Sequence, residues 1–173
     1  MLVYRIQKLR HLATALTGEG ARLTGGRWNP VGVPLVYAAT TPELALLETL
    51  VHLDGTPLSD LPPFGLLTIQ APDDGIEWLT SADLPADWAA QPYPDATASF
   101  LLPRLRPDYP SLAFALPSAV LSGSPSRNVL LNPLHPRAAE VALVASEPLV
   151  FDERLRPAAP PTPQPGKRRP RPS

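Results

Sequence analysis

The sequence predicts an α+β fold. Many short apolar runs have the length and composition of β-strands, whereas only two to four short helices are expected between them. No internal repeat is present, which argues against a solenoid or a propeller. The 173 residues fit a single domain with a sizeable hydrophobic core.

The first predicted elements are two strands separated by a turn-rich loop. Residues 2–6 form a short β-like run, and residues 7–20 follow with only a weak pattern. Residues 24–30 combine paired glycines with an Asn-Pro pair, which is typical of turns. Residues 33–39 form the second run, in which Pro34 stands near the start, where a strand tolerates proline.

The clearest helix start follows this strand. Thr41 can cap the helix, Pro42 suits its first position, and Glu43 suits its first turn. Leucines and Val51 at helical spacing extend the helix to about His52.

The remaining predicted elements are short. Residues 71–111 are rich in loops, with helical turns expected around 83–90 and 95–104. Further strands are predicted at residues 64–70, 111–116, 129–132, 141–145 and 149–151.

The composition excludes several classes of protein. Because the chain has no cysteine, disulfides, zinc fingers, thiolate catalysis and iron–sulfur clusters are excluded. No apolar stretch approaches the roughly 20 residues of a membrane-spanning helix, and no signal peptide is visible, so we expect a cytoplasmic protein without a membrane partner. No nucleophile elbow, phosphate-binding loop or metal-binding motif occurs. The three histidines are far apart, so no metal is expected; they are His11, His52 and His135.

The net charge of −1 conceals two regions of opposite charge. Residues 1–155 hold ten basic and sixteen acidic residues, whereas residues 156–173 hold five basic residues and seven of the 25 prolines. The second region has almost no large apolar side chain, so we expect a folded domain over 1–155 and a disordered, proline-rich basic tail over 156–173. The tail is either a solvated extension or a nucleic-acid-binding arm, and the acidic body argues against nucleic-acid binding as the main function.

The loop around Arg27 is the first candidate functional segment. Gly25 and Gly26 allow the backbone to approach a ligand closely, and the neighbouring guanidinium of Arg27 suits a bidentate phosphate contact. The indole of Trp28 can stack on a base or a sugar. The alternative is a hairpin turn with a buried Trp28 and an exposed Arg27.

Glu48 is the second candidate. It lies on the predicted helix among leucines, and a carboxylate in apolar surroundings is costly unless it has a partner or a task. The alternatives are a solvent-facing glutamate and a pair with His52, four residues further along the helix.

Taken in order, six segments of the chain resemble the RES-domain family, which is named for an arginine, a glutamate and a serine. The resemblance covers about residues 3–155. It is carried by residues 25–30, 35–38, 44–48, 116–120, 128–136 and 151–155.

This resemblance implies a fold similar to that of ADP-ribosyltransferases, with a mixed β core and short helices around a nucleotide cleft. Family members are mostly toxins of bacterial type II toxin–antitoxin pairs. They degrade NAD by hydrolysis or phosphorolysis of the nicotinamide–ribose bond. At least one branch instead transfers ADP-ribose to a protein, and this transferase activity is the main alternative function.

The resemblance also assigns roles to individual residues. Arg27 would bind the NAD diphosphate, Glu48 would stabilise the charge that develops on the ribose, and Ser118 would contact that ribose. Tyr37 would stack on nicotinamide, and Asn128 would bind the ribose or orient Glu48. The full set of NAD-binding residues that it implies is Tyr4, Arg27, Trp28, Tyr37 and Asn128.

The sequence departs from the family pattern in two places. The loop after Ser118 contains three further serines that compete for the serine position, namely Ser122, Ser124 and Ser126. A Gly-Asp pair expected near the middle of the chain is replaced by Pro94 and Asp95.

The implied partners follow from the family. NAD would be the substrate, with no cofactor and no metal. The cognate antitoxin would be a small helical DNA-binding protein whose C-terminal part plugs the toxin cleft. Contact with nucleic acid would be only indirect, through that antitoxin, and the resemblance also allows a homodimer. A nucleic-acid-binding module that uses the basic tail is the third and least favoured function.

Overall fold

The computed structural model describes residues 1–53 and 56–155. The predicted disordered tail, residues 156–173, lies outside these described residues, and so does the hypothesis that the tail binds nucleic acid. The division of the chain at residue 155 therefore stays a prediction.

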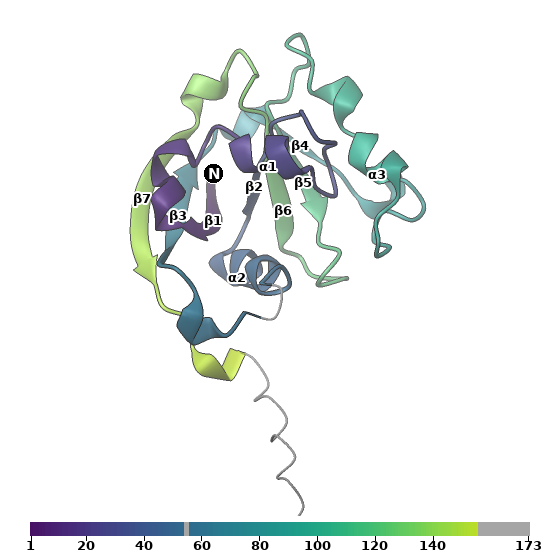
Figure 1. Ribbon diagram of the computed structural model, residues 1–173. Helices are drawn as coiled ribbons and strands as arrows, with labels where there is room; N and C mark the ends of the chain where they lie inside the picture. The colour runs from purple at the N-terminus through teal and green to yellow at the C-terminus, as the bar shows by residue number, and fades with distance from the viewer. Residues whose placement is uncertain (54–55, 156–173) are drawn as a thin grey trace, which may run out of the picture.

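The described chain forms one mixed sheet with short helices around it (Figure 1), which confirms the predicted α+β class. The strand order is β4-β5-β6-β2-β1-β3-β7, and β4 and β5 are the parallel pair among antiparallel neighbours. The strands are β1 (Leu2–Lys8), β2 (Val36–Ala39), β3 (Phe64–Gln70), β4 (Ile76–Trp78), β5 (Ala113–Pro117), β6 (Arg127–Leu131) and β7 (Ala142–Leu149). The α-helices are α1 (Glu19–Thr24), α2 (Pro42–Leu50) and α3 (Asp95–Ser99), and the first 3₁₀ helix is η1 (Leu9–Thr14).

Several elements differ between the prediction and the structure. The two runs predicted at 141–145 and 149–151 are replaced by the single strand β7; Pro148 does not interrupt it, because an edge strand tolerates proline. The strand β4 was not predicted, because its three residues are too few to show an alternating pattern. The helix predicted to reach His52 ends at Leu50, and Val51, expected on its apolar face, is 51% exposed.

The sheet consists of two halves that meet at a single residue pair. Strand β1 pairs with β2 only through Tyr4 and Ala39, whereas it pairs with β3 along its whole length. Figure 1 shows the two halves, β7-β3-β1 on the left and β2-β6-β5-β4 on the right. Beyond the shared pair, Arg5 Nη1 donates to the carbonyl oxygen of Tyr37 at 2.6 Å. Burial lowers the pKa of Arg5 to about 10, so this bridge is still charged at neutral pH.

Strand alternation gives this sheet two chemically different faces. On one face, Val36 and Ala38 belong to a core cluster against which Leu16, just after η1, packs; we call it the η1 face. The side chains of Tyr37 and Ala39 point to the opposite face, which α2 partly covers; we call it the α2 face.

The strand register sets four side chains in one row across the α2 face. Tyr4 is opposite Ala39, Ala39 is opposite Asn128, and Asn128 is opposite Leu116. The row thus crosses β1, β2, β6 and β5. It brings the predicted site residues Tyr4 and Asn128 to the same face although they are far apart in the sequence.

Two separate clusters cover the α2 face. Leu44 and Ala45 of α2 pack on Ala39, and Tyr4 and Ile6 of β1 flank them. The part of the face over β5 and β6 is covered by a larger apolar cluster, whose buried members are Trp28, Leu35, Leu79, Leu84, Leu101, Phe114, Leu116 and Leu130.

Replacing Phe114 by alanine is expected to destabilise the fold strongly. Phe114 is fully buried beside Leu130, and its ring centroid lies 6.0 Å from that of Tyr109. Removing a buried phenylalanine leaves a cavity and costs about 3–5 kcal/mol. Urea denaturation should show this loss, whereas Trp78→Ala, at an aromatic residue that is 56% exposed, should change the free energy of unfolding by less than about 1 kcal/mol. Equal stability of the two variants would contradict the assigned core.

Candidate active site

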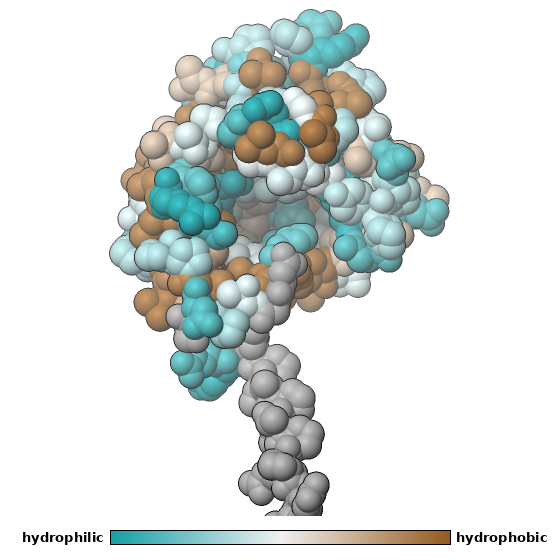
Figure 2. Space-filling model, in the orientation of Figure 1, coloured by the Kyte–Doolittle hydropathy of each residue, from teal (hydrophilic) through white to brown (hydrophobic). Residues whose placement is uncertain are grey.

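A hollow lies on the molecular surface between the chain around α1 and the helix α2. Figure 2 shows it at the centre of the view, in the orientation of Figure 1. The loop after α1 carries Arg27, and α2 carries Glu48. The two charges are close enough that Glu48 influences the pKa of Arg27, yet they form no ion pair within the described residues.

Glu48 faces the sheet because of its position on α2. Thr41 Oγ1 accepts a hydrogen bond from the amide of Leu44 at 3.3 Å, which fixes the helix start as predicted. Residues three and four apart share a helix face, so Glu48 lies on the same side as the buried Ala45 and Leu44. The carboxylate is therefore half-buried at the edge of the contact between α2 and the sheet.

One oxygen of the Glu48 carboxylate is held by two side chains from distant strands. Its Oε1 accepts from Ser118 Oγ at 2.8 Å and from Asn128 Nδ2 at 2.7 Å. Within the described part of the chain, Oε2 has no hydrogen-bond partner, which leaves it available to a ligand. The glutamate therefore has the polar partners that its apolar surroundings require, whereas His52 is exposed and donates no hydrogen bond to it.

Ser118 is the serine that reaches Glu48. It follows β5, is 1% exposed, and its Oγ accepts from the amides of Val120 and Leu121 at 3.1 Å each. The hydroxyl can then donate only to the carboxylate. Its rivals are placed differently: Ser122 is exposed, and Ser124 Oγ caps the amide of Ser126 within its own loop.

Ser118→Ala is expected to lower stability by about 1–3 kcal/mol. The substitution removes the acceptor of two part-buried amides and a donor to Glu48, and such groups are costly when left unpaired. Denaturant unfolding should show the loss, whereas Ser122→Ala, at an exposed serine, should stay within about 0.5 kcal/mol of the original protein. A neutral Ser118→Ala would contradict the hydrogen-bond assignment.

Arg27 sits in a tight turn and is anchored by a distant segment. A bridge between Gly26 and Asn29 closes the turn around it. Its Nη1 donates to the carbonyl oxygens of Trp88 at 2.6 Å and Ala90 at 2.9 Å, and its Nη2 donates to Gln91 Oε1 at 3.0 Å. Within the described residues, Nε–H and one Nη2 hydrogen stay available. Burial lowers the pKa of Arg27, and the nearby charge of Glu48 opposes that change.

Trp28 lies in the core. It is 2% exposed, its ring stacks on that of Trp88 at 6.1 Å, and it meets Phe100 edge-on at 6.2 Å. The alternative of a hairpin turn with a buried Trp28 is therefore right for Trp28. Its exposed Arg27 is not found, because Arg27 is half-buried. In this position Trp28 supports the Arg27 turn and exposes no ring face for stacking on a ligand.

Tyr37 is tied to the Arg27 turn through its hydroxyl. The hydroxyl donates to Asn29 Oδ1 at 2.7 Å and accepts from the amide of Trp28 at 3.1 Å. A Cβ at Gly26 would stand 2.6 Å from that hydroxyl, so only glycine fits there. Burial raises the pKa of Tyr37, which keeps the phenol neutral at physiological pH.

Asn29 is a site residue that the sequence did not single out. Its side chain is fully buried, and its Nδ2 donates to the carbonyl oxygens of Ala21, Pro30 and Val33 while Oδ1 holds Tyr37. The Asn29-Pro30 pair predicted the turn, and this pair is the sequence feature from which the structural role of Asn29 could have been predicted.

Two further residues named in the sequence analysis remain, namely Tyr4, which the resemblance assigns to NAD binding, and Asp95, which stands where the family has a Gly-Asp pair. Tyr4 is half-buried and packs in the cluster of Ala39 and Leu44 beneath α2. Asp95 is exposed at the first position of α3, where a carboxylate suits the helix dipole.

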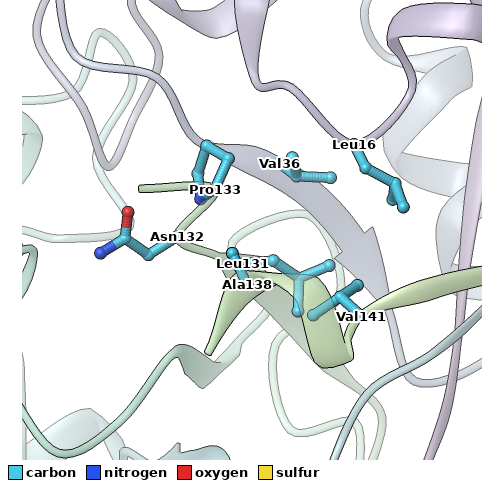
Figure 3. A pocket seen from close by; sticks show the side chains of 7 residues that line it. All are labelled: Leu16, Val36, Leu131, Asn132, Pro133, Ala138 and Val141. Carbon is cyan, nitrogen blue, oxygen red and sulfur yellow. The ribbon is translucent and has the colours of Figure 1, made fainter. Parts of the chain in front are cut away.

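Two cavities in the described part of the chain are lined by residues other than Arg27 and Glu48. One, of about 140 Å³, lies on the η1 face, because Val36 and Leu131 line it (Figure 3). The other, of about 270 Å³, lies near Leu134 and Leu102. Across residues 1–53 and 56–155, no three histidine, aspartate or glutamate side chains gather as metal ligands would, and no helix has the length and apolarity to cross a bilayer.

The fold and site define a mixed α+β domain with a hydrogen-bonded glutamate and an anchored arginine on either side of a hollow. The RES domain profile matches residues 2–152, in agreement with the resemblance of the sequence. The chain belongs to the RES domain family.

Individual relatives agree with this assignment. The protein "Toxin Res" of Yersinia enterocolitica is 37% identical over 90% of this chain and its own full length. The "Prs ADP-ribosylating toxin" of Sphingobium sp. is 36% identical over 83% of this chain and 88% of its own. Among solved structures, the M. tuberculosis MbcT–MbcA toxin–antitoxin complex has a chain with a similar fold, with a TM-score of 0.64 and 22% identity over 89% of this chain and 85% of that chain.

Proposed function

We propose that this protein is the toxin of a toxin–antitoxin pair and that it degrades NAD in the cytoplasm by cleaving the nicotinamide–ribose bond. The observation that carries the proposal is the Glu48 carboxylate, whose Oε1 is held by Ser118 and Asn128 while Oε2 has no partner within the described chain. Arg27 carries a half-buried guanidinium whose Nε–H and one Nη2 hydrogen have no partner among the described residues.

Cleavage of the nicotinamide–ribose bond requires few catalytic groups besides Glu48 and Arg27. When the bond between ribose C1′ and the nicotinamide nitrogen breaks, its electron pair leaves with nicotinamide, which becomes neutral, and positive charge develops on the ribose. No general acid is needed, since the leaving group is already cationic. A fixed carboxylate beside C1′ stabilises this charge without having to reorganise, and that is the role we assign to Glu48.

The other residues then position the substrate. Arg27 pairs with the diphosphate, for which its planar fork is better suited than lysine. Ser118 and Asn128 fix the orientation of Glu48, and Tyr37 forms a neutral wall for the nicotinamide ring. Water, phosphate or a protein side chain then attacks C1′. NAD is the substrate in each case, and no metal or cofactor takes part in the proposed reaction.

The direct test is release of nicotinamide from NAD by the pure protein, with and without inorganic phosphate. Free ADP-ribose as product indicates hydrolysis, and ADP-ribose 1-phosphate indicates phosphorolysis. Absence of nicotinamide release under both conditions, and in the presence of a cell lysate, would refute the proposal.

Transfer of ADP-ribose to a protein is the second candidate. The name of the Sphingobium relative favours it. Incubation of a lysate with adenylate-labelled NAD would place label on a protein if this candidate is right, and only on free nucleotide if it is wrong.

We propose a helical DNA-binding antitoxin as partner, seated in the hollow of Figure 2, so that the toxin contacts nucleic acid only through it. The fold similarity to a chain of the MbcT–MbcA toxin–antitoxin complex supports an antitoxin as the partner. Growth arrest on expression of the toxin, relieved by the product of the neighbouring gene, would test this partnership, and a size measurement of the pure protein would test a homodimer.

A further inference from the structure

The segment from Trp88 to Tyr93 is held against the Arg27 turn by several contacts. The Trp88 ring stacks on Trp28, and Arg27 donates to the carbonyl oxygens of Trp88 and Ala90 and to the side chain of Gln91. Two adjacent residues of the turn therefore fix where this segment runs. The segment ends at Tyr93, beside the guanidinium.

The aromatic side chain of Tyr93 is not part of the hydrophobic core clusters. It is 38% exposed, and its ring centroid lies 5.4 Å from Cζ of Arg27. It is also close enough to Tyr37 to influence the pKa of that phenol. An exposed ring beside an anchored arginine has the arrangement of a platform on which a base can stack.

The exposure of the site residues indicates which end of a dinucleotide belongs beside Tyr93. Glu48 is half-buried and is held by Ser118, which is 1% exposed, whereas Tyr93 is 38% exposed, so the Glu48 end is the more enclosed of the two and shields the reacting ribose better from water. The diphosphate at Arg27 separates that ribose from the second base. This base takes no part in the reaction and can lie in the more exposed region, where Tyr93 stands.

We propose that Tyr93 and Arg27 form the adenosine diphosphate subsite of this protein, with the Tyr93 ring stacked on adenine and the free edge of Arg27 on the diphosphate. The inference rests on the proposed function, since it takes NAD as the ligand. Stacking on an aromatic ring does not depend on the identity of the base, so Tyr93 contributes a factor of about 5 to 100 in affinity while other contacts select adenine.

The test compares ADP with inorganic pyrophosphate as competitors of NAD cleavage. ADP carries the base and the diphosphate, whereas pyrophosphate carries the diphosphate alone. For Tyr93→Ala we expect the inhibition constant of ADP and the KM for NAD to rise about 5- to 100-fold, with the constant of pyrophosphate changed less than twofold. Tyr93→Phe, which keeps the ring, should restore ADP affinity. Trp78→Ala, an exposed aromatic on the edge strand β4, is the matched control and should change none of these values.

Two outcomes would overturn the subsite. One is an unchanged ADP constant in Tyr93→Ala. The other is an equal loss of ADP and pyrophosphate, because Tyr93 would then act only by supporting Arg27. If the original protein does not cleave NAD, the proposed function fails, and calorimetric titration of ADP into the same variants, together with their melting curves, still decides the subsite.

Discussion

Replacing Glu48 by glutamine is expected to lower nicotinamide release by a factor of at least about 10²–10³ while leaving the fold intact. Glutamine has the same shape, and its Oε1 can still accept from Ser118 Oγ and Asn128 Nδ2. What disappears is the negative charge that faces the ribose as positive charge develops there. Losing one preorganised electrostatic contact of this kind typically costs 10²–10³ in kcat.

The measurement is a kinetic comparison in which kcat falls and the KM for NAD changes little, because the carboxylate acts in the transition state more than in the bound ground state. Glu43→Gln is the matched control, since Glu43 is an exposed carboxylate on the same helix. Its activity should equal that of the original protein, and both variants should keep a similar melting temperature. A Glu48→Gln variant that still releases nicotinamide at the original rate would refute the assigned site.

The start of α2 shows which features of this protein local sequence can predict. The capping threonine, the proline at the first helical position and the acidic first turn all act within four residues of Thr41, and the structure has the helix start where they predicted it. The same local reasoning marked Glu48 as a carboxylate among leucines that needs a partner or a task unless it faces solvent, and it left that choice open.

The identity of the partners lies beyond local reasoning. Ser118 and Asn128 are 70 and 80 residues away from Glu48 in the sequence, and the strand register and the course of the loop after β5 decide which side chains meet it. The amino-acid types alone also could not distinguish Ser118 from the three serines of the following loop, Ser122, Ser124 and Ser126. What distinguishes it is the turn in which its hydroxyl accepts from two backbone amides.

The surroundings of Arg27 show the same limit. Its three hydrogen-bond acceptors come from a loop 61–64 residues further along the chain, and that loop has no regular pattern that a sequence could reveal. The expectation that Trp28 binds a ligand came from its position next to Arg27. In a tight turn, however, neighbouring side chains point in different directions, and Trp28 points into the core.

Replacing Arg27 by lysine is expected to lower kcat/KM for NAD about 100-fold or more, although the positive charge is kept. A guanidinium can donate to Trp88 O, Ala90 O and Gln91 Oε1 and still present a free edge to a diphosphate, whereas an ammonium has three donors in all. The lysine ammonium can therefore donate either to the loop acceptors or to the diphosphate, but it cannot serve both. Each lost hydrogen bond to a charged group costs about 1.5–3 kcal/mol, so two such losses correspond to a factor of at least about 10².

The Arg27→Lys experiment measures KM and kcat for NAD together with the inhibition constant of pyrophosphate, which should rise by a similar factor. Arg22→Lys is the control, because Arg22 lies five residues away on α1 and forms an exposed pair with Glu19. It should behave as the original protein does. If Arg27→Lys instead kept its affinity for pyrophosphate, the charge alone would suffice, and the anchored geometry of the guanidinium would have no part in holding the diphosphate.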